Sequence, residues 1–177
     1  MWRAAAAGTK GVITDAFEDI VTGVNAPLYV VTAASQGERA GCLVGFATQC
    51  SMEPVRFGVW LSKLNRTYRV ASCATTLVTH LLRAGDRGLA ERFGGETGDD
   101  VDKFDGVEWR PGPGECPVLA GLDWFAGTLV DRFDTGDHVA FVLTPFDGAC
   151  ERRGIPQLTY ADITNVEAGH PIDEEET

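Results

Sequence analysis

The close spacing of short apolar segments between residues 27 and 62 constrains the fold more than any other feature of the sequence. These segments are rich in β-branched and aromatic residues, which favour strands over helices. They are PLYVVTAA (27–34), CLVGFATQCS (42–51) and RFGVWLS (56–62). Gly37 and Gly41 mark a turn between the first two segments, and Pro54 ends the second. The sequence therefore predicts an antiparallel meander of three strands.

Further strands and a few short helices follow this meander. The additional strands are predicted over TTLVTHLL (75–82), WFAGTLVDRFDT (124–135) and HVAFVLTPFD (138–147). Apolar residues at helical spacing predict an amphipathic helix over residues 11–24, and shorter helices within 66–74 and around 89–93. PGPGECPVL (111–119) is rich in Pro and Gly, which predicts a surface loop without regular structure.

Strands and helices do not alternate along this chain, so a doubly wound parallel sheet is disfavoured. We predict a mainly β fold, an antiparallel β-barrel with a few short helices. The length of 177 residues suits one domain. We place that domain at residues 11–165 and expect residues 1–10 and 166–177 to be flexible termini.

Charge and cysteine usage exclude several classes of function. Fifteen Lys and Arg residues against 26 Asp and Glu give a net charge of −11, which disfavours nucleic acids and anionic membranes as partners. The five cysteines are scattered and form no CxxC pair, so neither a metal site nor a disulfide framework is indicated. No apolar run approaches the roughly 18 residues of a membrane helix. We expect a cytoplasmic protein with reduced thiols and no membrane anchor.

Small polar residues flank the apolar segment 56–62 on both sides. Thr48, Gln49 and Ser51 precede it, and Asn65 and Thr67 follow it. Such residues can simply cap the ends of strands and helices, or they can form two walls of one pocket. A helix that begins after Asn65 would present free N–H groups and a positive dipole end, which favour a phosphate.

Arg66 and His138 are the charged or titratable candidates near these segments. Arg66 would lie just inside the helix that follows Asn65, where it could add charge-assisted hydrogen bonds to an anion. His138 follows the turn residues Gly136 and Asp137, so it either stabilises this turn or faces a ligand. The motifs GxSxG, HExxH, GxxxxGK[ST] and GxGxxG after a strand are absent.

The order of several segments resembles the flavin reductase-like family, whose fold is an FMN-binding split β-barrel. The segments are GFATQCSMEPVRFGVWLS, KLNRTYRV, LAERF, DKFDG and GDHVAFVL, which follow VTGVNAPLYVVTA. The resemblance covers about residues 18–160. Each segment alone is a weak signal, but their order and spacing together are specific.

The resemblance implies a set of cofactor-contacting residues. The isoalloxazine ring would lie against the strand that carries Ala47, Thr48, Gln49, Cys50 and Ser51. The phosphate would be held near Ser62, Lys63, Leu64, Asn65, Arg66 and Thr67. Phe93 of LAERF belongs to the implied set as well, and His138 would lie near the flavin and the nicotinamide.

The resemblance implies an NAD(P)H-dependent flavin reductase that uses FMN, with FAD as the other candidate flavin. Hydride passes directly from nicotinamide to flavin, so no side chain must act as acid, base or nucleophile. The reduced flavin could serve a partner monooxygenase or another acceptor. The alternative is a non-catalytic flavin- or haem-binding protein with the same barrel. The resemblance also implies a homodimer. Phe57 and Trp60 lie on opposite faces of one strand and supply more hydrophobic surface than one side of a small barrel needs, which agrees with this expectation.

Two residues depart from the usual pattern of the family. Cys50 lies within the segment that would face the ring, where a thiol could alter the packing and redox properties of the flavin, but we expect a buried structural thiol. His80 lies in the strand 75–82, where it either faces the core, as we expect, or adds a second polar group near the site.

Overall fold

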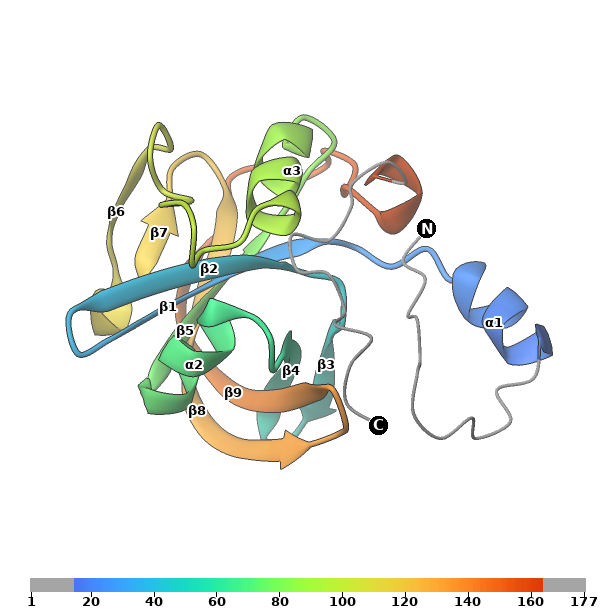
Figure 1. Ribbon diagram of the computed structural model, residues 1–177, viewed down its shortest axis with the longest axis horizontal. Helices are drawn as coiled ribbons and strands as arrows, with labels where there is room; N and C mark the ends of the chain where they lie inside the picture. The colour runs from blue at the N-terminus through green and yellow to red at the C-terminus, as the bar shows by residue number, and fades with distance from the viewer. Residues whose placement is uncertain (1–14, 164–177) are drawn as a thin grey trace.

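Residues 15–163 are described by the structure, a computed structural model. They form a curved antiparallel sheet of seven strands in the order β2-β1-β5-β8-β9-β4-β3 (Figure 1). The strands are β1 Tyr29–Ser35, β2 Glu38–Val44, β3 Ala47–Met52, β4 Val55–Ser62, β5 Thr76–Leu81, β8 Asp123–Asp134 and β9 His138–Ala149. The predicted fold class, a mainly β antiparallel barrel with a few short helices, is confirmed.

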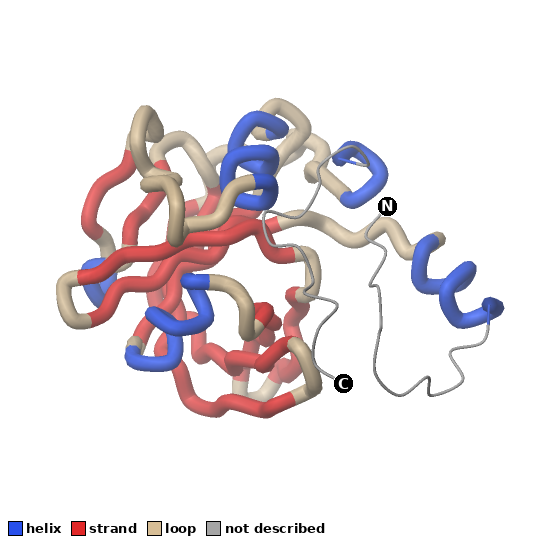
Figure 2. The backbone as a smooth tube through the Cα atoms, viewed as in Figure 1, coloured by secondary structure: helices blue, strands red, loops and turns tan. Residues whose placement is uncertain are grey.

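Short helices lie around this sheet, as the colouring by secondary structure shows in Figure 2. They are α1 Asp15–Thr22, α2 Arg66–Cys73, α3 Arg87–Gly95 and the 3₁₀ helices η1 Pro113–Glu115 and η2 Tyr160–Ile163. α2 packs on β1 and β2, and α3 packs on β2. The helices predicted within 66–74 and around 89–93 are confirmed as α2 and α3. Every helix between residues 15 and 163 is too short or too polar to cross a membrane.

The N-terminal helix ends two residues earlier than predicted. α1 covers Asp15–Thr22 of the expected 11–24 and projects away from the barrel (Figure 1). Its apolar residues Phe17 and Ile20 are 56% and 70% exposed. Residues 11–14 and both predicted flexible termini lie outside the described residues, so the boundaries 11–165 of the domain stay a prediction.

The predicted meander of three strands is wrong, because the segment 42–51 forms two strands instead of one. β2 ends at Val44 and β3 begins at Ala47, and these two strands are the opposite edges of the sheet. The chain leaves β2 at Gly45, where a side chain would overlap the ring and hydroxyl of Tyr160. Tyr160 therefore occupies the space beside the junction, and β3 pairs only with β4.

The segment 111–119 is also more regular than the sequence predicted. It contains η1 and most of a two-stranded sheet that pairs β6 Trp109–Pro111 with β7 Pro117–Leu119. Burial explains this order, because Val118 and Leu119 are only 3% and 1% exposed. Gly114 has a φ of 63°, a left-handed conformation that glycine adopts without steric cost and that the tight connection needs.

His80 faces the core, as predicted, and joins three strands. Its side chain is fully buried on β5. The N–H of Leu119 in β7 donates to Nε2 at 3.0 Å, so Nδ1 carries the proton and donates to the carbonyl of Val30 in β1, also at 3.0 Å. Burial lowers the pKa of His80 to about 4, because the charged form would lose its hydration.

Candidate functional site

The loop after β4 and the hairpin between β8 and β9 meet at one end of the barrel. Ser62 pairs with His138 at the ends of β4 and β9. The N–H of Lys63 donates to the carbonyl of Asp137 at 2.9 Å, and Nζ of Lys63 lies 2.8 Å from a carboxylate oxygen of Asp134. These contacts hold the predicted phosphate segment beside the predicted histidine, although the two are far apart in the sequence.

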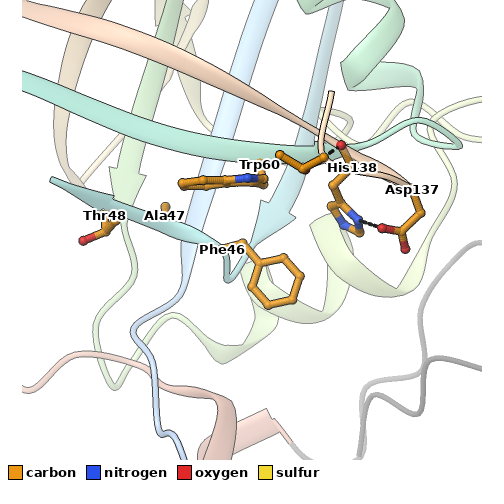
Figure 3. A pocket seen from close by; sticks show the side chains of 7 residues that line it. Phe46, Ala47, Thr48, Trp60, Asp137 and His138 are labelled. Carbon is orange, nitrogen blue, oxygen red and sulfur yellow. Dashed lines mark hydrogen bonds and ion pairs between the residues drawn. The ribbon is translucent and has the colours of Figure 1, made fainter. Parts of the chain in front are cut away.

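A pocket of about 360 Å³ opens beside this junction (Figure 3). It is lined by Phe46, Ala47, Thr48, Trp60, Thr135, Asp137 and His138. Ala47, Thr48 and His138 were predicted from the sequence as site residues, and the fold brings them together from β3 and β9. The lining mixes aromatic rings with a few polar groups, which is typical of sites for small organic ligands.

His138 is held in place by contacts on two sides. Its Nδ1 lies 2.9 Å from Oδ1 of Asp137, and its ring meets Phe46 edge to face with the centroids 5.5 Å apart. The hydroxyl of Thr135 donates to the carbonyl of His138 at 2.8 Å. Because Nδ1 faces the carboxylate, Nε2 is the ring nitrogen left for a ligand. The side chain is 24% exposed, so a ligand in the pocket can reach it.

β3 is an edge strand, and one side of its backbone is therefore available for hydrogen bonds. Thr48 and Gln49 are exposed on it, and Ser51 is half-buried. The expectation that Cys50 is buried is wrong, since its side chain is exposed. The register between β3 and β4 shifts between Gln49 and Ser51, and this bulge takes Cys50 out of the regular pairing.

The predicted helix start after Asn65 is confirmed. Oδ1 of Asn65 accepts a hydrogen bond from the N–H of Thr67 at 3.1 Å and caps α2. The hydroxyl of Ser62 accepts from the N–H of Leu64 at 3.3 Å in the preceding turn. Thr67 is buried, and its Oγ1 has no hydrogen-bond partner among the described residues.

Arg66 points toward the loop that follows α3. Its guanidinium donates to the carbonyl of Gly98 at 2.8 Å and lies 3.8 Å from Glu38. Arg66 and Thr67 line a second pocket of about 370 Å³, between the β1–β2 turn and residues 98–104. An anion at this helix terminus would therefore share the charge of Arg66 with Glu38.

Phe93 is a core residue in this structure. Its side chain is 1% exposed and meets Phe104 edge to face with the ring centroids 5.5 Å apart. Lys103 of the DKFDG segment is 4% exposed, and its Nζ donates to the carbonyl of Phe93 at 2.9 Å. A direct contact between the Phe93 side chain and a ligand is not supported by this burial, and the DKFDG segment anchors the end of α3.

Four lining residues of the first pocket were missed by the sequence reasoning: Phe46, Trp60, Thr135 and Asp137. Thr135 and Asp137 belong to the TGDH turn, so the sequence alone indicated that they lie close to His138. The alternation along β4 indicated that Trp60 faces away from Phe57, but it could not indicate what Trp60 would meet there. The position of Phe46 at the pocket depends on the break between β2 and β3, and the sequence carries no clear signal for this break.

The flavin reductase like domain family matches residues 21–167. A ferric-chelate reductase (NAD(P)H) of Archaeoglobus fulgidus is 29% identical over 145 residues, which are 80% of this chain and 85% of that protein. A high molecular weight rubredoxin of Moorella thermoacetica is 29% identical over 145 residues, and the match spans 63% of its length. The reductase subunit HsaB of a flavin-dependent monooxygenase from Mycobacterium tuberculosis is 29% identical over 100 residues, 54% of this chain and 52% of that protein.

Solved structures share the fold. The flavin reductase HpaC complexed with NADP⁺ superimposes with a TM-score of 0.72 over 83% of this chain and 92% of that chain, at 20% identity. An oxidoreductase of Sinorhizobium meliloti gives the same TM-score of 0.72 over 82% of this chain and 50% of that chain, at 26% identity. These superpositions agree with the antiparallel barrel described above.

Proposed function

The chain belongs to the flavin reductase like domain family, and from this premise we propose that it is a flavin-dependent oxidoreductase that passes hydride from NADH or NADPH to a flavin, FMN or FAD. The observation that carries the proposal is the pocket that gathers Ala47, Thr48 and His138. A relative over most of the chain is named a ferric-chelate reductase (NAD(P)H), which supports nicotinamide as the reductant.

The residues around the pocket fit the ring of a flavin, and those at the start of α2 fit its phosphate. The ring would lie along β3 at Ala47, Thr48, Gln49, Cys50 and Ser51, where an edge strand offers backbone and side-chain groups to its polar rim. The phosphate would be held by residues 62–67. Support for this placement comes from the capped start of α2.

The protein's part in the reaction is to bind and orient. When bound, the flavin supplies the hydride-accepting chemistry, so the chain needs no nucleophile or metal for this step. His138 would orient the nicotinamide through Nε2, while Asp137 holds Nδ1. Phe46 and Trp60 would keep water away from one side of the pocket.

An anaerobic titration tests the proposed function. The purified chain should bind FMN or FAD and take on the absorption of oxidised flavin at about 450 nm. Addition of NADH or NADPH without oxygen should bleach that band. If neither NADH nor NADPH bleaches the bound flavin, the protein binds flavin but lacks the proposed activity. A haem spectrum in place of the flavin band would contradict the proposal altogether.

A C2 homodimer is part of the proposal. Several large apolar side chains are exposed in residues 15–163, and burial of such side chains at an interface is favourable. Those near the pocket end of the barrel are Phe46 at 55%, Leu64 at 50% and Phe133 at 53% exposed. Light scattering at micromolar concentration should give twice the monomer mass of 19.0 kDa. A monomer mass with flavin bound would contradict the dimer.

The reduced flavin could then serve a partner enzyme in the cytoplasm. HsaB is named as the reductase subunit of a flavin-dependent monooxygenase, which supports a partner monooxygenase for this chain. If the flavin leaves the protein, oxidation of NAD(P)H should need added flavin in excess of the protein. A purified protein that retains its flavin through dialysis and gel filtration would contradict this role as a supplier of free flavin.

A further inference from the structure

Trp60 is the one large side chain on the outer face of β4 that lines the pocket. Its neighbours Val59 and Leu61 point into the barrel and are 0% and 1% exposed. Trp60 lies between them in the sequence, points the other way, and is half-buried beside Ala47 and Phe46. In Figure 3 its indole is seen nearly edge-on along the strand, with His138 near the same opening.

The space under the indole exists because residue 58 has no side chain. A Cβ atom at Gly58 would lie 3.0 Å from Cζ3 and 3.2 Å from Cη2 of Trp60. The six-membered ring of the indole therefore lies over the backbone of Gly58. An added methyl group would force the ring to give by a few tenths of an ångström, so the pair of Gly58 and Trp60 sets where the aromatic wall stands.

This wall suits a flat ring better than an irregular ligand. Phe46 and His138 form a second aromatic group at the opening, and their two rings meet each other edge to face. Ala47 between the two groups contributes only a methyl group. A planar heteroaromatic ring that enters such a pocket gains by stacking on the indole face, a contact that depends on the ring and not on a phosphate.

We propose that Trp60 is the ring-stacking residue of the site and determines how tightly the isoalloxazine of the flavin is held. This inference rests on the proposed function, because it takes the flavin as the planar ligand. It goes further in assigning the strength of binding to one side chain on β4, whereas the ring-contacting residues expected from the sequence all lie on β3.

The test is a binding titration of the full chain with FMN and with riboflavin, by calorimetry and by quenching of tryptophan fluorescence. Trp60→Leu keeps apolar bulk but removes the aromatic face, and Trp60→Phe keeps a smaller face. Stacking on one aromatic side chain corresponds to about 5- to 150-fold in affinity. Trp60→Leu should lower the affinity for FMN and for riboflavin by equal factors within this range. Trp60→Phe should lower both affinities less. Unchanged affinity for both ligands, or a loss for FMN alone, would overturn the proposal.

Gly58→Ala provides a second arm, compared between the parent chain and the Trp60→Leu background. The added methyl group should displace the indole and weaken riboflavin binding in the parent chain. It should have no further effect in the Trp60→Leu background, since no indole remains to be displaced. Equal losses in both backgrounds would mean that Gly58 acts through the strand itself, which would contradict the proposal.

Trp124→Phe is the matched control. Trp124 lies on β8 beside Arg110, outside the lining of the pocket, so its replacement should leave flavin affinity unchanged.

If Trp60→Leu does not fold, Trp60→Phe and Gly58→Ala carry the same comparison. A parent chain that binds no flavin overturns this inference together with the proposed function. A parent that binds flavin and is bleached by NAD(P)H, but is indifferent to Trp60, overturns only the stacking role. Selective loss of NAD(P)H affinity would assign Trp60 to the nicotinamide instead.

Discussion

Nζ of Lys63 lies 2.8 Å from Oδ2 of Asp134, and this ion pair joins the loop after β4 to the hairpin that carries His138. Both side chains are more than a third exposed. Exposed ion pairs contribute little to global stability. The value of this pair lies in fixing the relative position of two loops that belong to the same site.

Removal of the ammonium group should change the titration of Asp134 more than the stability of the fold. The hydrogen bond from Lys63 and that from the N–H of Gly136 hold the pKa of Asp134 below its usual value. In Lys63→Met this pKa should rise toward the ordinary value, with little change in melting temperature. Carbon NMR of the carboxylate measures it, and an unchanged pKa would show that the pair does not form in solution.

His138→Ala should separate flavin binding from flavin reduction. The side chain is held by Asp137 and Phe46 at the mouth of the pocket, so its loss should leave flavin content nearly intact. Misplacement of the nicotinamide by about 1 Å can lower the rate on the order of 100-fold. Stopped-flow reduction by NAD(P)H without oxygen gives this rate directly. A fully loaded variant with the parent's rate would reject the role of His138.

Arg66→Ala should weaken FMN binding by about 1.5 to 3 kcal/mol, the range for a charged hydrogen bond. Riboflavin has no phosphate and should bind the variant and the parent equally. The guanidinium also donates to the carbonyl of Gly98. Arg66→Lys therefore serves as a control that keeps the positive charge but loses the planar set of guanidinium donors. Equal losses for FMN and riboflavin would mean that Arg66 acts only by holding residues 98–104.

His80 should make the fold sensitive to mild acid. Its pKa is about 4 in the folded state, against about 6.5 in an unfolded chain. The unfolded state therefore binds more protons between these values, and the free energy of unfolding falls as the pH drops through this window, by about 3 kcal/mol in total. Urea unfolding at about pH 7.5 and about pH 4.5 should show this loss in the parent and a smaller one in His80→Gln. Equal losses in the two proteins would contradict the assignment.

Local patterns were sufficient for most strands and for α2 and α3, because each of these elements carries its own periodicity and its own turn or cap. Asn65 as the cap of α2 is an example, since the bond from Thr67 is made within one turn. The separation of β2 from β3 could not be predicted, because the need for a glycine at position 45 comes from the ring of Tyr160, which is distant in the sequence.

The candidate site divides in the same way. Thr48 and His138 were found because they stand in recognisable segments, whereas Trp60 and Phe46 line the pocket only through the pairing of β3, β4 and β9. Cys50 was expected to be buried, but regular alternation does not hold across the bulge that contains it. Edge strands with bulges are therefore where sequence patterns are least informative in this chain.

The close approach of Gly45 and Tyr160 couples the substitutions that are possible at two positions distant in the sequence. Any side chain at position 45 would occupy the space of the Tyr160 ring, so a larger residue there requires this ring to move or position 160 to become smaller. A larger residue at position 45 should therefore appear among descendants of this sequence together with a smaller one at position 160. A double exchange, Gly45→Ala with Tyr160→Ala, is the shortest route by which this junction could evolve.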